Sequence, residues 1–307
     1  MSTVIERLPP GARVAIVRLR SLGDCVLTTP AVALLKQARP DLEIAVIVED
    51  AFTGVFTGNP DVERILAPAA SEIHKWRPHL TLNLHGGARS VRLTLAARSA
   101  LRAGFGHFRL QSIYNIRIPR AQEILGVDRK VHTAEHLASA MFYLGVPECG
   151  IPRARLFARS RPRLRPYAVL HPLASAPEKT WPASHFQDIA KYIENQHGLE
   201  PVFIAAAGEN LEPFRNWTCI QGANLEDVKS LLLGASIFIG NDSGPAHMAA
   251  AFGLPLVVLF GSSDPEIWHP WRTESVVLTD PRGIQAIPVD EMIEAIQKLP
   301  VQAPETK

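Results

Sequence analysis

The sequence predicts an α/β fold made of two Rossmann-like domains that face a cleft between them. Two observations support this prediction. Short apolar runs alternate with helical patterns along the chain, and the alternation is interrupted once, by a proline- and arginine-rich stretch at residues 151–166, before it restarts. A chain of 307 residues is also too long for one comfortable core and suits two domains of about 150 residues each. We therefore expect domains at residues 1–160 and 161–307.

Each half contains apolar runs typical of buried parallel strands, separated by amphipathic helical patterns. In the first half the predicted strands are 14–17, 44–48 and 80–84, and the predicted helices are 25–37 and 133–144. In the second half the predicted strands are 167–170, 202–205, 237–239 and 256–260, and the predicted helices are 183–195, 224–233, 245–252 and 289–299. Strands that alternate with helices in this way are typical of parallel sheets with helical crossovers.

Composition narrows the possible classes of function. The formal net charge of +2 is too small by itself to indicate nucleic-acid binding. The three cysteines, Cys25, Cys149 and Cys219, lie far apart and form no disulfide or metal-binding pattern. Residues 1–10 contain charges and prolines instead of an apolar signal core, and no run of about 20 apolar residues exists. We therefore expect a cytoplasmic protein that binds no nucleic acid.

The first motif, RLRSLGD at residues 18–24, lies directly between the first predicted strand and the first predicted helix. Ligands in open α/β sheets bind at such loops, outside the carboxyl ends of the strands. Asp24 is therefore a candidate general base facing the cleft. The alternative is that Asp24 only caps the helix, which is a common role for aspartate at a helix start.

The second motif, GNDSGPAH at residues 240–247, follows a predicted strand and opens a predicted helix. Free backbone N–H groups at a helix start, with the helix dipole behind them, suit a diphosphate. Asp242, Ser243 and His247 place more polar chemistry there than a cap needs, although an ordinary capped turn is the alternative.

Two further loops carry candidate phosphate- and ribose-binding groups. Lys179 lies between a predicted strand and a helix, where it could reach a phosphate as a point charge, or could simply be a solvated surface lysine. Glu209 follows the strand at 202–205, where its carboxylate could accept hydrogen bonds from ribose hydroxyls. Glutamate is also favoured at helix starts without any ligand, so this second signal is weak.

The near-neutral total charge conceals a basic stretch in the first half. Between Arg89 and Lys130 there are nine arginines and lysines against two acidic residues, Glu123 and Asp128. Arginine forks match carboxylates and phosphates, so an anionic acceptor is one interpretation, and a solvated helix face is the other. The candidate acceptor-binding residues are Arg89, Arg92, Arg109, Arg117 and Arg120.

Several common motifs are missing from the sequence. There is no phosphate-binding P-loop, no GxGxxG, no GxSxG and no HExxH, which disfavours a dinucleotide dehydrogenase or a nucleoside triphosphatase. There is also no Asp-x-Asp pair of the kind that holds a divalent ion. We therefore expect neither a cofactor nor a protein-bound metal.

Taken together, the motifs resemble glycosyltransferase family 9, the ADP-heptose:lipopolysaccharide heptosyltransferases. The resemblance rests on RSLGD at 20–24 with TPA at 29–31, KTWP at 179–182 and NDSGPAHMAA at 241–250, in the family's order. It implies a GT-B fold and inverting transfer of a heptose from ADP-heptose to the inner core of lipopolysaccharide. It also implies residue roles: Asp24 as base, Lys179 on the phosphates, Glu209 on the ribose, and Asp242, Ser243, Gly244 and His247 in the donor loop.

The resemblance further implies an ADP-sugar donor, an anionic glycolipid acceptor and peripheral contact with the cytoplasmic face of the inner membrane. Three alternatives remain open: a family member with another nucleotide-sugar donor, a GT-B nucleotide-sugar epimerase, and a non-catalytic nucleotide-sugar binding protein. Asp24 argues against the last of these, because binding alone needs no base at that position.

Overall fold

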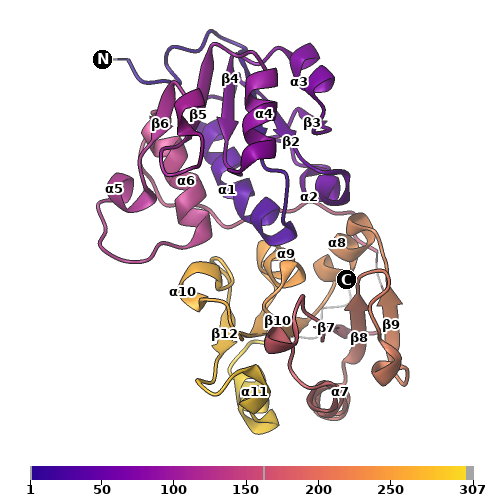
Figure 1. Cartoon of the computed structure of the whole chain (residues 1–307). Coiled ribbons are helices and arrows are strands. Elements are labelled where there is room, and N and C mark those ends of the chain that lie inside the picture. Colours follow the sequence, from indigo (N-terminus) through magenta and orange to yellow (C-terminus); the bar gives the residue numbers. More distant parts are fainter. Residues whose placement is uncertain (1, 162, 302–307) are drawn as a thin grey trace. The chain divides into compact units, whose positions relative to one another are not determined.

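The computed structural model of the protein describes residues 2–161 and 163–301. These residues form two compact units, which we call the N-terminal unit, up to Phe157, and the C-terminal unit, from Ala158 onward. Each unit contains one parallel sheet with helices packed on it (Figure 1).

The N-terminal unit has a six-stranded parallel sheet in the order β3-β2-β1-β4-β5-β6. Its strands are β1 (Arg13–Val17), β2 (Glu43–Ile47), β3 (Arg64–Leu66), β4 (Leu80–Asn83), β5 (Leu101–Phe105) and β6 (Ile116–Ile118). Its helices are α1 (Leu22–Ala38), α2 (Thr53–Phe56), α3 (Ala70–Trp76), α4 (Ala88–Ala96), α5 (Ala121–Leu125) and α6 (Thr133–Leu144), with short 3₁₀ turns at Asp50–Phe52 and Gln111–Ile113. Helices α1 and α6 pack against each other, and α3 and α4 form a second pair.

The C-terminal unit repeats this plan, with the strand order β12-β11-β10-β7-β8-β9. Its strands are β7 (Tyr167–His171), β8 (Glu200–Ala205), β9 (Thr218–Gln221), β10 (Ile237–Asn241), β11 (Leu256–Leu259) and β12 (Ser275–Leu278). Its helices are α7 (Ala183–His197), α8 (Leu225–Leu233), α9 (Gly244–Phe252), α10 (Pro265–Trp268) and α11 (Val289–Gln297), with 3₁₀ turns η3 (Pro177–Lys179), η4 (Glu212–Phe214) and η5 (Ile284–Ala286).

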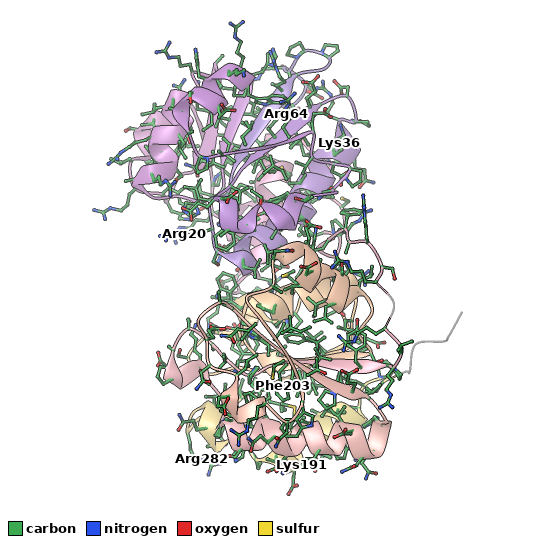
Figure 2. The ribbon with its side chains drawn as sticks, turned by 90° about the vertical axis from the view of Figure 1, so that its right-hand side faces the viewer. Arg20, Lys36, Arg64, Lys191, Phe203 and Arg282 are labelled. Carbon is green, nitrogen blue, oxygen red and sulfur yellow. The ribbon has the colours of Figure 1, made fainter. Side chains whose placement is uncertain are left out.

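Apolar side chains of the central strands form the core of each unit. Alternate residues of a strand point to opposite faces, so a strand buried on both faces needs apolar residues throughout. In the C-terminal unit one face packs against α7 and α11 around Phe203, which is fully buried. Figure 2 shows Phe203 inside this unit and the charged ends of Lys191 and Arg282 at its surface. The charged residues on α7 therefore lie on its outer side, and the apolar stripe faces the sheet.

Both sheets have the same topology, read from opposite ends: the third, second, first, fourth, fifth and sixth strands of the unit lie side by side. This is the Rossmann order, and its switch point lies between the first and fourth strands. The switch point is β1/β4 in the N-terminal unit and β7/β10 in the C-terminal unit. The predicted pair of Rossmann-like domains is confirmed, and in each unit the chemistry is expected outside the carboxyl ends of those two strands.

Helix α1 carries the first motif despite a proline in its interior. Pro30 has no N–H and so cannot donate the usual helical hydrogen bond to the carbonyl of Val26, four residues earlier. The hydroxyl of Thr29 takes over this role and donates to the Val26 carbonyl at 2.8 Å. The same hydroxyl accepts a hydrogen bond at 3.0 Å from the backbone N–H of Arg155. The TP pair thus keeps α1 intact and ties the last segment of the unit to it.

No helix in the described residues, 2–161 and 163–301, is long and apolar enough to cross a membrane.

Candidate active-site residues

Asp24 lies in the first turn of α1, and its carboxylate contacts the residue that precedes the helix. Ser21 is the N-cap, and Asp24 Oδ2 accepts hydrogen bonds from the Ser21 hydroxyl at 2.9 Å and from its backbone N–H at 3.4 Å. A side chain at this position that reaches back to the N-cap N–H forms half of a capping box. The capping interpretation of Asp24 therefore describes a contact that exists, but it accounts for only one of the two carboxylate oxygens.

The other oxygen of Asp24 binds a buried arginine. Arg18, directly after β1, donates from Nη1 to Asp24 Oδ1 at 3.1 Å and from Nη2 to the carbonyl of Leu84, directly after β4. The Arg18 side chain is 6% exposed and that of Asp24 is 24% exposed. Burial lowers the pKa of Arg18, and the Asp24 charge opposes that shift. Both oxygens of Asp24 are thus held at the β1/β4 switch point, with the carboxylate still partly open to solvent.

Two histidines lie close enough to this pair to feel its charges, a third contacts one of them, and sequence analysis did not single them out. They follow β4 (His85), follow β5 (His107) and lie on α6 (His136). The ring of His136 stacks on Phe105 with centroids 4.1 Å apart. The ring centroid of His107 lies 5.6 Å from that of His136. Burial lowers the pKa of His136 to about 4 and also lowers the pKa of His85, with the nearby Arg18 charge as a further cause in both. These imidazoles are therefore neutral at neutral pH and add no charge beside Asp24.

The five candidate acceptor arginines divide into two groups. Arg89, Arg109 and Arg120 follow the carboxyl ends of β4, β5 and β6, on the same sheet edge as Asp24. Arg89 pairs with Glu49, and Arg120 lies close enough to His107 to lower its pKa, second to partial burial. Arg92, one turn into α4, and Arg117, in the middle of β6, are both exposed. Arg89, Arg109 and Arg120 therefore lie on the sheet edge that carries Asp24, whereas Arg92 and Arg117 lie away from it.

In the C-terminal unit, Lys179 ends the 3₁₀ turn η3 in the loop after β7. The buried Asn241 fixes this loop: its Nδ2 donates to the Pro172 carbonyl at 2.8 Å, and its Oδ1 accepts from the Trp181 N–H at 3.1 Å. A Cβ added to Gly261, directly after Phe260, would lie 2.1 Å from the Glu178 carbonyl, so the loop approaches the end of β11 as closely as glycine permits. Among the described residues the Lys179 ammonium has no ion-pair partner.

A cavity of about 460 Å³ lies beside this loop, lined by residues 174–177 and 180–183 together with Gln285.

The Asp242–His247 segment lies next to the Lys179 loop, because β10 pairs with β7. Ser243 is the N-cap of α9, and Pro245 occupies the first helical turn, where a missing N–H costs nothing. The described residues offer no hydrogen-bond partner to the backbone N–H of Gly244. The Asp242 side chain is partly exposed, whereas His247 is 5% exposed and lies 6.2 Å from the ring of Trp268. This helix start therefore presents an open N–H in the loop after β10, next to the strand β7 whose following loop carries Lys179, and such a helix start is suited to a diphosphate.

Glu209 lies in the turn after β8, one strand further along the same edge. One carboxylate oxygen, Oε2, accepts a hydrogen bond from the Ala206 N–H at 2.7 Å, which fixes the side chain against its own turn. Within residues 2–161 and 163–301 no group hydrogen-bonds the second oxygen, Oε1, which is therefore available as an acceptor. The structure thus places Lys179, Glu209 and the 242–244 turn on one edge of the C-terminal sheet.

The hydroxyl of Ser243 lies 3.0 Å from Nδ1 of His171, the last residue of β7. His171 is 8% exposed, and burial lowers its pKa to about 4. Like Arg18, His171 was missed from the sequence, although it directly follows the apolar run of a predicted strand. Its place at the end of a predicted strand was the only feature of the sequence that could have indicated a functional role.

Acidification is expected to destabilise the fold through His136 and His171. Burial lowers the pKa of each from 6.5 to about 4, so the unfolded chain binds more protons than the folded chain between these values. The stability they confer is complete above pH 6.5 and is lost as the pH falls toward 4, by up to about 1.4 kcal/mol per pH unit for each group. Thermal unfolding at several pH values in this range measures the slope. His136→Phe should flatten it, and an unchanged slope in this variant would contradict the assignment.

No group of three or more His, Cys, Asp or Glu residues within 2–161 and 163–301 is arranged to hold a metal ion.

With two Rossmann-like units and a fixed carboxylate in place, comparison with known families identifies the class. The chain belongs to glycosyltransferase family 9 (heptosyltransferase), whose family model matches residues 79–287. It is therefore a glycosyltransferase, and its fold is that of the GT-B enzymes.

Individual relatives support the same class. The chain is 25% identical to lipopolysaccharide heptosyltransferase 3 of Escherichia coli K12 over 93% of this chain and 98% of the relative. It is 25% identical to lipopolysaccharide heptosyltransferase 1 of Salmonella typhimurium over 82% and 89% of the two chains. Among solved structures, a family 9 glycosyltransferase from Veillonella parvula has a TM-score of 0.82 at 20% identity, covering 94% of this chain and 96% of that one. Escherichia coli heptosyltransferase WaaC with ADP has a TM-score of 0.77 at 19% identity, covering 93% and 99%.

Proposed function

We propose that this enzyme transfers a heptose from ADP-heptose to the inner core of lipopolysaccharide with inversion at the anomeric carbon. The observation that carries the proposal is the Asp24 carboxylate, held through both oxygens at the β1/β4 switch point. Arg18 and Ser21 fix the orientation of a carboxylate that is still partly exposed, so it can accept a proton from a hydroxyl placed against its open side. A protein that only binds a nucleotide sugar does not require such a group.

In this mechanism the acceptor hydroxyl gives its proton to Asp24 as its oxygen attacks the anomeric carbon from the face opposite the diphosphate. The bond from that carbon to the diphosphate oxygen breaks, and its electron pair leaves with ADP. Lys179 and the N–H groups at Ser243 and Gly244 stabilise the charge that develops on the departing ADP. Asp242 accepts hydrogen bonds from hydroxyls of the donor sugar, and Glu209 accepts them from the ribose hydroxyls. His247 contacts the phosphates.

The choice of donor and acceptor is supported by the relatives. Both curated relatives named above are lipopolysaccharide heptosyltransferases, and a further WaaC structure of the same fold contains ADP-2-deoxy-2-fluoro heptose. A glycolipid acceptor also implies that the enzyme works from the cytoplasm, in peripheral contact with the inner membrane.

The test is a transfer assay with purified protein and lipopolysaccharide truncated before the inner-core heptoses. ADP-heptose is compared with ADP-glucose and UDP-glucose, and the acceptor product is weighed by mass spectrometry. We expect a mass increase of one heptose with ADP-heptose only, and a product anomer opposite to that of the donor by NMR. Transfer from another sugar nucleotide would overturn the donor, and isomerisation of the donor without transfer would indicate an epimerase.

Acceptor affinity is expected to depend on salt and on the strand-end arginines. Exposed charges act over roughly a Debye length, about 8–10 Å at moderate salt. The KM for the anionic acceptor should therefore rise about threefold or more as salt increases, and the KM for the donor should change less. Replacing both Arg109 and Arg120 by glutamate should raise the acceptor KM in the same selective way.

Arg282→Glu provides the matched control, because Arg282 is an exposed arginine of the C-terminal unit whose guanidinium pairs with Asp280. If the KM for the acceptor changes neither with salt nor when Arg109 and Arg120 are replaced by glutamate, the basic stretch is a solvated face.

A further inference from the structure

Ser243 does not use its side chain as an N-cap serine ordinarily does. Such a hydroxyl normally accepts a hydrogen bond from the N–H of the second or third residue of the helix. Here α9 is nine residues long, and the Ser243 side chain makes no such bond. The hydroxyl instead lies 3.0 Å from His171 Nδ1.

The local sequence explains why the hydroxyl is free to turn away from the helix. The second helical residue, Pro245, has no N–H to offer. The third, Ala246, donates its N–H to the backbone carbonyl of Ser243 at 3.1 Å. Of the two N–H groups that an N-cap hydroxyl usually receives, one is thus absent and the other is already bonded, and the side chain of Ser243 is left for another role.

His171 is held rigidly enough to fix this hydroxyl. It ends β7, where its backbone pairs with Gly240 of the neighbouring β10, and a Cβ at position 240 would lie 2.9 Å from the His171 carbonyl. Its side chain is nearly fully buried, and burial keeps the imidazole neutral. A neutral, buried ring nitrogen close to a hydroxyl fixes the direction of that hydroxyl without placing a charge beside the helix start.

We propose that His171 is a positioning residue for the donor: its Nδ1 holds the Ser243 hydroxyl to one side, so that the backbone N–H of Gly244 stays open to the diphosphate. This inference rests on the proposed function, because it assumes that the donor's phosphates bind at the 242–244 turn. Without His171, the Ser243 hydroxyl rotates freely and can turn into the space through which the phosphate reaches the Gly244 N–H.

The experiment is a double-mutant cycle between His171 and Ser243, read out by calorimetry with ADP and by kinetics with ADP-heptose. His171→Leu should weaken ADP binding about tenfold and raise the donor KM by a similar factor, with the acceptor KM unchanged. His171→Asn places an amide atom where Nδ1 lies and should restore ADP affinity to within about threefold of wild type. In the Ser243→Ala background His171→Leu should cause no further loss, because the hydroxyl it controls is gone.

A second histidine of the same unit provides the control. His197, half-buried at the end of α7, packs on Tyr192 and lies at the last turn of the helix, so His197→Leu should leave ADP affinity unchanged. Additive losses in the cycle, or an asparagine variant as weak as the leucine variant, would overturn the positioning role while leaving the proposed function intact. Failure of the wild-type protein to bind ADP would overturn both.

Discussion

Replacing Asp24 by asparagine is expected to slow sugar transfer by about 10²–10⁴-fold, the usual cost of losing a general base. The amide has nearly the same shape and still offers an oxygen to Ser21 or to Arg18, but it cannot take the proton of the acceptor hydroxyl. ADP affinity should stay within about twofold of wild type, because the donor-binding groups belong to the other unit. Single-turnover kinetics with ADP-heptose and calorimetry with ADP measure the two effects separately.

The same substitution leaves the buried Arg18 guanidinium without its counterion, and breaking a buried pair costs about 3–5 kcal/mol of stability. Rates must therefore be compared at a temperature where circular dichroism shows the variant folded. Asp41→Asn is the matched control, since Asp41 is also an ion-paired aspartate of the N-terminal unit, bound to Arg39 at 2.8 Å near the surface. If the Asp24 variant keeps near-full turnover, Asp24 is only a helix cap.

Lys179→Ala is expected to weaken ADP binding by about 1.5–3 kcal/mol, the range for a lost hydrogen bond to a charged group, or about 10–150-fold in Kd. The rate of transfer should fall as well, because the same ammonium stabilises the departing diphosphate. Stability should change little, because no ion pair of Lys179 is lost within the described residues. Calorimetry with ADP and steady-state kinetics with ADP-heptose give both numbers.

Lys191→Ala controls for loss of a lysine in the same unit. Lys191 lies on α7, is 61% exposed and pairs with Asp188 one turn away (Figure 2). If the Lys179 variant has the same ADP affinity and the same transfer rate as wild type, Lys179 does not contact the donor.

Most inner strands of each sheet were predictable, whereas the edge strands and the inner strand β5 were not. Strands such as β1 and β10 are buried on both faces, so their sequences are continuous apolar runs that stand out. The edge strand β9 alternates half-buried and exposed residues over only four positions, which is too short for a period of two to be recognised. Strand β5 includes Arg102 and Gly104, and the glycine is explained only by Tyr114, whose ring a Cβ at 104 would meet at 2.6 Å. That contact depends on the folded sheet and leaves no trace in the local pattern.

For the site, the sequence predicted the motif positions but not the partners that orient them. Asp24 and Ser243 belong to segments whose place between strand and helix can be inferred from local patterns. Arg18 is in the first motif, yet its role depends on the Leu84 carbonyl, 66 residues away, and the burial that goes with it. His171 contacts Ser243 across 72 residues. Such pairs arise from the pairing of β1 with β4 and of β7 with β10, which strand-by-strand reasoning cannot supply.

The shared strand order of the two sheets has a consequence for how this enzyme can diversify. The loop that leads into the helical turn of Asp24 follows the first strand of its unit, and the loop that carries Lys179 follows the first strand of the other, so the two loops are topological counterparts. One is residues 18–21, and the other, residues 172–182, is much longer. In the proposed function, the same position in two sheets of one topology thus supplies the base in one unit and a phosphate-binding cation in the other. Because the groups described above that fix each loop belong to its own unit, we expect that exchanging the N-terminal unit for that of a related enzyme would change the acceptor while the donor stays the same.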